Sequence, residues 1–397
     1  MTRTVPDVAI VGVGATPYYK RGTSWPQTST EMAGKAILAA CEDAGLSVAD
    51  IDGFAYYSGA GAGYGETMDT ATFMETLGIP EVTFSAALTS GGGGSAGSIG
   101  LARAAIVAGD ATVVVTVMTL QQARQRLGSV FAAVPPTPLG SFLQPSGLSG
   151  PGHLMSVLAR RHMHNYGTRR EAFAEIAISQ RLNAANRPTA LKRDPITLDD
   201  YFNARMIAEP LCLFDFCLET DGAVAVVTTS LERARDLRQK PVPVIAAAHG
   251  GHKDWGRAFA WMGMPDDTFA SSGHAAIADR LYQRAGVTPA DIDVALLYDH
   301  FTPMVLMQLE DYGFCKKGEG GDFVESGAIR YDGGSLPVNT HGGQLSEAYI
   351  IGMTHIKEAV EQMRGEAVNQ VAGAELALVT GGPAALPVSG LILGRDS

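Results

Sequence analysis

Two tyrosines and two histidines stand beside glycine turns at the ends of apolar runs in the sequence. Tyr298 and His300 lie in LLYDHFTP, and His341 and Tyr349 lie in NTHGGQLSEAYIIGM. A further glycine pair, which includes Gly382, joins the last two apparent strands in VTGGPAALPVSG. Phenol and imidazole groups can transfer protons, and the carboxyl ends of strands are the usual positions for ligand chemistry in α/β proteins. The alternative is that both tyrosines are half-buried packing residues, as most tyrosines are.

A run of four glycines, residues 91–94, separates a β-type stretch from a helical stretch in SGGGGSAG. Such a run indicates a close approach of the backbone to a phosphate, a strained turn or the place of a missing nucleophile. It lacks the Gly-Lys-Ser/Thr ending of a P-loop. GVGATP, residues 12–17, has Pro17 in place of the third glycine of a dinucleotide fingerprint, and no helix opens there. Neither segment predicts nucleotide binding.

The composition excludes several classes of protein. A net charge of -11 over 397 residues argues against nucleic acid and anionic membrane surfaces as partners. No apolar stretch approaches the roughly 20 residues of a spanning helix, and the N-terminal run is too short for a signal peptide. HMH (162–164) and HGGH (249–252) lack acidic or cysteine partners at metal spacing. The few cysteines form no C-x-x-C pair and favour a reducing cytosol. We therefore expect a cytoplasmic protein without a metal. The cysteines, which we interpret as structural, are Cys41, Cys212, Cys217 and Cys315.

Apolar strands alternate with helices from the N-terminus onward. The pattern predicts a buried strand over residues 7–12, a helix over 31–44 that ends at Gly45, a helix over 98–108 and a strand over 112–117. Continuous apolar strands between helices are typical of a layered α/β fold whose sheet is covered on both faces.

The chain also contains an internal duplication. AGLSVADIDGFAYY (44–57) aligns without gaps on AGVTPADIDVALLY (285–298), and each copy has the pattern of a helix end, a turn and a strand. A period of this length indicates a duplicated domain. We predict an N-terminal half over 1–238 and a C-terminal half over 239–397. An insertion at about 121–211 carries amphipathic helices, as a substrate lid commonly does.

The whole chain, from VAIVGVGATPYYK to PVSGLILG, resembles the thiolase superfamily, within it the sterol carrier protein X and lipid-transfer-protein branch. The resemblance implies the thiolase fold, in which duplicated α/β halves form a five-layer αβαβα sandwich with an inserted loop domain, usually as a homodimer. It places the two thiolase cysteines at residues 91–94 and 381–383, and the thiolase histidines at Tyr349 in GGQLSEAYIIG and Tyr298 in YDHF. A thioester-forming thiolase needs a thiolate and a base, and neither is present at these positions.

The remaining pattern is similar to the steroid side-chain aldolases, thiolase-fold proteins that cleave a β-hydroxyacyl-CoA without a covalent intermediate. LYDHFTP and NTHGGQLSEAYIxGM carry this likeness. It implies proton transfer by two tyrosines and an OB-fold, zinc-ribbon-containing partner subunit. The expected reaction converts a 17-hydroxy steroid-carboxyl-CoA to a 17-ketosteroid and propionyl-CoA or a similar short acyl-CoA. The CoA moiety belongs to the substrate, and we expect no cofactor bound to this chain.

The retro-aldol hypothesis gives each candidate residue a role. One of Tyr298 and Tyr349 takes the proton of the β-hydroxyl group, and the other protonates the thioester enolate. Free tyrosine has a pKa of about 10, so His300 or His341 would supply positive charge beside the phenolate or polarise the thioester carbonyl. The predicted substrate and oxyanion site consists of Asn339, Gly342, Gly343, Gly93 and Gly382.

Two alternatives stay open at this point. A cysteine-free acyltransferase or decarboxylating condensing protein of the same fold would form carbon–carbon bonds rather than break them. A non-catalytic acyl-CoA or sterol carrier, or a scaffold subunit, would have lost the chemistry altogether. The replacement of two histidines by tyrosines argues against simple decay, because decay would not place an ionisable phenol at both positions.

Overall fold

Strands and helices alternate through both predicted halves of the chain. The computed structural model describes residues 7–57, 69–88, 91–122, 141, 143–148, 150–251, 269–384 and 387–396. The N-terminal half contains β1 (Val8–Ala15), β2 (Tyr19–Lys20), α1 (Ser29–Ala44), β3 (Gly53–Tyr57), α2 (Thr70–Leu77), β4 (Phe84–Leu88), α3 (Gly94–Ala108), β5 (Val113–Leu120), β8 (Thr220–Ser230) and α9 (Leu231–Ala234). The insertion contributes α6 (Pro151–Tyr166), α7 (Arg170–Ala185), α8 (Leu198–Asn203), β6 (Met206–Ala208) and β7 (Leu211–Cys212). The C-terminal half contains β9 (Val242–Gly250), α11 (Ala275–Ala285), β10 (Val294–Leu296), α12 (Thr302–Asp311), α13 (Gly320–Glu325), α14 (Gly343–Ser346), α15 (Met353–Arg364), β11 (Leu376–Gly381) and β12 (Val388–Gly394).

The strand order repeats from one half to the other. The main sheet runs β10-β11-β12-β9-β1-β8-β5-β3-β4, with β2 paired to β8. In the N-terminal half, β8 pairs antiparallel with β1 and β5, and β5 pairs parallel with β3. In the C-terminal half, β12 pairs antiparallel with β9 and β11, and β11 pairs parallel with β10. The two halves therefore have equivalent strands in the same relative directions. The parallel pair is β3–β5 in one half and β10–β11 in the other. This topology agrees with the predicted duplication, although the predicted boundary near residue 238 stays a prediction.

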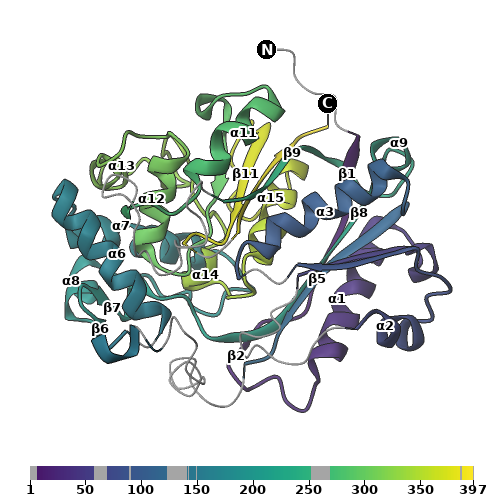
Figure 1. Ribbon diagram of the computed structural model, residues 1–397, viewed down its shortest axis with the longest axis horizontal. Helices are drawn as coiled ribbons and strands as arrows, with labels where there is room; N and C mark the ends of the chain where they lie inside the picture. Colours follow the sequence, from purple (N-terminus) through teal and green to yellow (C-terminus); the bar gives the residue numbers. More distant parts are fainter. Residues whose placement is uncertain are drawn as a thin grey trace.

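Helices cover the sheet in layers. Helix α1 packs on β1, β5 and β8 on the outer side of the N-terminal half, and α11 packs on β9 and β12. Helices α3 and α15 lie in the middle, and each touches strands of both halves (Figure 1). The resulting order is helix, strands, central helices, strands, helix, which is the predicted five-layer arrangement. The central layer is important for function because the segments that precede α3 and α15 carry the glycine run and Tyr349.

The two sequence repeats build the same joint between a helix and a strand. Each repeated helix ends at a left-handed glycine, and a short capped 3₁₀ turn follows. The last aspartate of the Asp-Ile-Asp motif then accepts backbone N–H groups at the start of the neighbouring parallel strand. Asp52 binds Thr112 and Val113 in this way, and Asp293 binds Glu375 and Leu376. The motif therefore sets the register of the strands that lead to Tyr57 and Tyr298.

The insertion forms the two predicted amphipathic helices as α6 and α7, and Figure 1 shows them beside α12 and α13. Helix α7 packs on α12, α13 and α14, so the insertion contacts the C-terminal half next to the turn that carries Tyr349. Within the insertion, residues 123–140, 142 and 149 lie outside the described residues. Among the helices that the structure describes, none has the length and apolarity needed to cross a membrane.

Candidate active site

The structure brings the two candidate tyrosines together. Tyr298 is the second residue after β10, and Tyr349 lies in the turn between α14 and α15. Both side chains belong to the same buried apolar cluster, with exposed fractions of 2% and 6%. Their hydroxyl oxygens are 3.5 Å apart. Two phenols at this separation can exchange a proton after a small adjustment.

Backbone contacts hold both tyrosines in place. The Tyr298 N–H donates to Thr380 Oγ1, and the Gln308 side chain donates to the Tyr298 carbonyl. The Thr220 hydroxyl accepts from the Tyr349 N–H and donates to its carbonyl. Each ring is therefore fixed at its backbone by a side chain from another element, which limits its movement.

The glycine run, residues 91–94, packs against the Tyr298 ring, and this contact explains why glycine is required there. A Cβ atom on Gly92 would lie 2.6 Å from Tyr298 Oη and 2.4 Å from the ring. A Cβ atom on Gly94 would collide with the ring of Tyr57. The predicted empty place of a nucleophile is thus bordered by the Tyr298 phenol, which any side chain at position 92 would displace. The prediction named Gly93; Gly92 is the residue that touches the phenol.

Gly93 and Gly382 do meet, as parts of one backbone contact. A Cβ atom on Gly382 would lie 2.2 Å from the Gly93 nitrogen, and one on Gly93 would lie 1.7 Å from the Pro387 carbonyl oxygen. Both residues must be glycine because two main chains approach each other here. The structure therefore supports their position at the site, and it gives them a packing role.

Helix α3 begins immediately after this turn, at Gly94, and not at residue 98 as the sequence predicted. The Ser95 hydroxyl donates to the Gly92 carbonyl, which ties the glycine turn to the start of the helix. The N-terminal end of α3 consequently lies at the Tyr298 hydroxyl. A helix N-terminus carries partial positive charge, which stabilises an anion placed beside it.

Burial favours the neutral form of both predicted histidines, which argues against the first of the two roles predicted for them, the supply of positive charge. His300 lies edge-on to Tyr298 with ring centroids 5.2 Å apart, and burial lowers its pKa to about 3. His341 is fully buried; burial, together with neighbouring His355, lowers its pKa well below the usual range. His341 Nε2 lies 4.0 Å from Glu347 Oε2, and the effect of burial on its pKa exceeds that of this carboxylate. Polarisation of the thioester carbonyl by either ring stays a prediction.

Asn339, Gly342 and Gly343 hold the turn in shape. The Asn339 amide accepts from the Leu297 N–H and donates to the Leu297 carbonyl, and its backbone is left-handed at φ 48°. The Gly342 N–H donates to the Asn339 carbonyl. A Cβ atom on Gly343 would lie 2.1 Å from Asp299 Oδ2. The Asn339 amide and the Gly342 N–H thus bond within the protein, and the oxyanion role of these residues stays a prediction.

Asp299 and His355 complete the site, and the sequence analysis did not select either. The Asp299 carboxylate accepts from the Gln344 N–H and lies 3.0 Å from His355 Nε2. The His355 ring lies under Tyr298, with centroids 6.3 Å apart and a 25° angle between the planes. Asp299 had a signal, since it follows Tyr298 directly. His355 had none, because it stands inside a helix without a motif around it.

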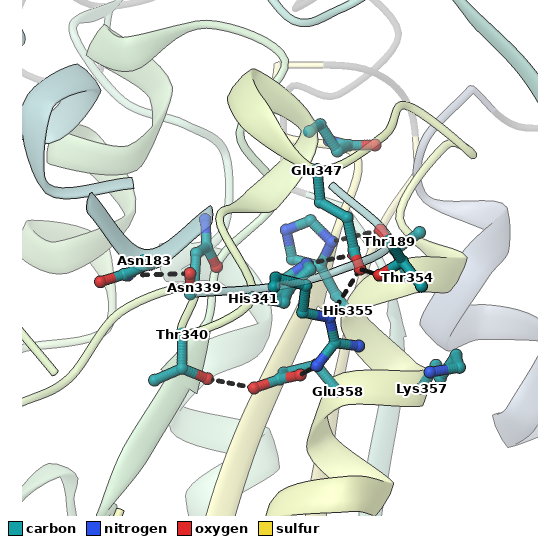
Figure 2. A network of polar contacts seen from close by, with 12 residues as sticks. Asn183, Thr189, Asn339, Thr340, His341, Glu347, Thr354, His355, Lys357 and Glu358 are labelled. Atoms are coloured by element: carbon teal, nitrogen blue, oxygen red, sulfur yellow. Dashed lines mark hydrogen bonds and ion pairs between the residues drawn. The ribbon is translucent and has the colours of Figure 1, made fainter. Parts of the chain in front are cut away.

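A buried ionic network lies beside these histidines. Arg187 contacts Glu347, Glu358 and Glu361, with each N–O distance 2.7 Å. Figure 2 shows His341 and His355 next to Glu347, and Thr340 bonded to Glu358. Burial raises the pKa of Glu358 to about 7, although Arg187 acts in the opposite direction. Within the described part of the chain, no group of three or more His, Cys, Asp or Glu side chains could hold a metal ion.

The comparisons with known proteins agree with this architecture. Residues 8–230 match the thiolase N-terminal domain family, and residues 259–395 match the thiolase C-terminal domain-like family. The chain belongs to the thiolase superfamily. It is 43% identical to a 17-hydroxy-3-oxo-4-pregnene-20-carboxyl-CoA lyase of Mycobacterium tuberculosis, over 98% of this chain and 99% of that protein. It is 39% identical to a steroid side-chain-cleaving aldolase of Thermomonospora curvata, over 98% of each chain.

A solved structure described as the Ltp2-ChsH2(DUF35) aldolase superposes with a TM-score of 0.89 at 38% identity. The alignment covers 100% of this chain and 99% of that one.

This thiolase-superfamily member contains no thiolate at the expected place. Burial raises the pKa of Cys41 and Cys212 to about 11 and that of Cys315 to about 12, and the pKa of Cys217 is raised as well. All four thiols are therefore protonated near neutral pH and are poor nucleophiles.

Proposed function

We propose that this protein is a steroid side-chain aldolase, a carbon–carbon lyase that acts on a 17-hydroxy steroid-carboxyl-CoA. The observation that carries the proposal is the pair of phenol hydroxyls, 3.5 Å apart, at the end of β10 and before α15. Full-length similarity to two aldolases of this class supports the substrate assignment. The protonated state of the four cysteines supports a reaction without an acyl-enzyme.

The geometry suggests an order for the proton transfers. Tyr298, at the N-terminus of α3, is the base, and as phenolate it takes the proton of the 17-hydroxyl group. The hydroxyl oxygen becomes the ketone as the bond from carbon 17 to the side chain breaks, and the electron pair of that bond forms the thioester enolate. Tyr349 gives its proton to the α-carbon of the enolate. The products are a 17-ketosteroid and propionyl-CoA.

The short distance between the phenols closes the cycle. After cleavage Tyr298 carries the substrate proton, and Tyr349 is a phenolate. Transfer of one proton across the 3.5 Å gap restores both residues to their starting states. The reaction therefore needs no co-reactant and no free CoA. His300, as a neutral imidazole 5.2 Å from the Tyr298 ring, can donate a hydrogen bond to the thioester oxygen.

We extend the proposal to assembly. The solved relative is an aldolase of Ltp2 with ChsH2(DUF35), and we propose a DUF35-type partner, with an OB-fold and zinc ribbon, for this chain. We also propose a homodimer. Strand β4 ends the sheet and alternates half-buried with exposed residues, as an edge that accepts another chain does. The CoA moiety belongs to the substrate, and the chain itself carries no cofactor in this proposal.

The test is product analysis by mass spectrometry with the steroid CoA thioester in D₂O and without added CoA. The protein is assayed with a DUF35 partner and alone, and the partner alone is the control. We expect the 17-ketosteroid and propionyl-CoA with one deuterium at the α-carbon. Products that appear only when free CoA is added would support a thiolytic acyltransferase instead. Binding without cleavage in every mixture would support a carrier.

A further inference from the structure

The turn that carries Tyr349 has a strained backbone. Ile351 has φ 47°, in the left-handed region that a β-branched residue rarely adopts, and Gly352 follows with φ 83°. Strain of this kind persists only where surrounding contacts hold it. Tyr349 lies two residues before Ile351, so the contacts that hold this turn also set the position of its phenol.

The insertion supplies many of those contacts. The N–H groups of Leu191 and Lys192 donate to the carbonyls of Glu347 and Ser346, and Arg181 Nε donates to Ser346 Oγ. The side chain of Glu347 accepts from Arg187 Nε and from Thr189 Oγ1, each at 2.7 Å. The segment 187–192 therefore binds the turn at Glu347 through both main chain and side chain.

The other two carboxylates fix the guanidinium itself. Glu358 and Glu361 both lie on α15, and each accepts one Nη of Arg187 at 2.7 Å. Arg187 is only 4% exposed, so its three charge-assisted bonds form in a dry environment. Because both Nη atoms are bound to α15, the orientation of the guanidinium is fixed, and its Nε–H points to Glu347.

We propose that Arg187, contributed by the insertion, is a positioning residue that acts through Glu347 to place the Tyr349 phenol against Tyr298. Helix α15 anchors the guanidinium, and the guanidinium holds the strained turn. The role of the insertion then extends beyond a substrate lid, because it determines whether the catalytic pair is assembled. This inference rests on the proposed function, since its readout is the aldol cleavage rate.

Two substitutions separate positioning from general stabilisation. Glu347→Ala and Glu361→Ala each remove one of the three carboxylates on the same arginine, and both leave Arg187 paired with two others. For the enzyme with its partner we expect Glu347→Ala to lower kcat about tenfold or more, with KM within about threefold, because small misplacement of a reacting group is costly. Glu361→Ala keeps kcat within about threefold, because Glu358 still anchors the guanidinium and the bond to the turn stays in place.

A double-variant comparison shows whether the effect passes through Tyr349. In a Tyr349→Phe background, Glu347→Ala lowers the remaining kcat by less than about threefold, because the hydroxyl that it positions is gone. Equal losses in the two single variants, an unchanged kcat in Glu347→Ala, or a tenfold loss that persists in the Phe background would each overturn the inference. If Glu347→Ala is unfolded by circular dichroism, Glu347→Gln and Glu361→Gln replace the pair, with the same ordering expected. Wild-type protein that cleaves nothing would overturn the proposed function instead.

Discussion

The two repeats end in the same residue, and the two copies are used differently. Tyr57 at the end of β3 and Tyr298 after β10 occupy equivalent positions in the aligned repeats. Both rings reach the glycine turn before α3, where Gly94 faces Tyr57 and Gly92 faces Tyr298. The Tyr57 hydroxyl donates to the Gly91 carbonyl. The Tyr298 hydroxyl instead lies 3.5 Å from the second phenol.

The difference shows what turns a structural tyrosine into a candidate catalytic one. In the N-terminal half, β3 continues the sheet toward β4. In the C-terminal half, the described segment between β10 and α15 includes α12, α13 and the turn with Tyr349. The two repeats thus carry equivalent tyrosines, and the segment that follows one of them carries its partner, Tyr349. The chemistry therefore depends on the asymmetry between the halves.

The largest effect on kcat is expected from deleting the Tyr298 hydroxyl, and deletion of the equivalent Tyr57 hydroxyl is the comparison. Tyr298→Phe lowers kcat by about 10²–10⁴-fold, because it deletes a general base. Tyr57→Phe keeps kcat within about threefold and lowers the free energy of unfolding by about 1 kcal/mol, because it leaves the Gly91 carbonyl without this donor. Steady-state rates and urea unfolding on both variants make the measurement. Similar kcat losses in both would mean that the two tyrosines are not functionally distinct.

A smaller effect is expected at the glycine that faces Tyr298. In Gly92→Ala the new Cβ would lie 2.6 Å from Tyr298 Oη and must push the phenol aside, which lowers kcat by about 10–100-fold for a shift near 1 Å. Gly100→Ala, in helix α3 after this turn, is the matched control. Among the described residues, its Cβ meets only Ala247 Cβ, at 3.2 Å, and we expect kcat within about threefold of wild type. Full activity in Gly92→Ala would show that the phenol position is not critical.

Sequence reasoning reached the layered fold, the duplication and the tyrosine pair, because periodic strands, a gapless repeat and family motifs record them directly. It did not separate Gly92 from Gly93, since a run of identical residues carries no register. It kept positive charge as one of two roles for His300 and His341, because the burial that lowers their pKa values comes from tertiary packing. Arg187 gave no signal, because its contact with Glu347 exists only once the insertion folds back onto the C-terminal half.

The smallest expected effect compares the N-caps of the two equivalent outer helices. The cap of α1 is Thr28, whose hydroxyl accepts from the Glu31 N–H. The cap of α11 is His274, a fully buried ring bonded to the Tyr312 hydroxyl, and burial lowers its pKa to about 3. A threonine cap contributes equally at every pH. A buried neutral histidine does not, because the unfolded chain takes up a proton below its ordinary pKa of about 6.5 while the folded chain cannot.

Stability should therefore fall as the pH drops from about 6.5 toward 3, and His274 should account for part of that fall. Between pH 7 and pH 5 we expect wild type to lose about 1–2 kcal/mol more than His274→Gln, measured by urea unfolding. Thr28→Ala should lower stability by about 1 kcal/mol at both pH values. A His274→Gln variant with the same pH dependence as wild type would mean that the folded protein accommodates the charged ring. The two halves would then differ in their tyrosines and not in how their outer helices respond to acid.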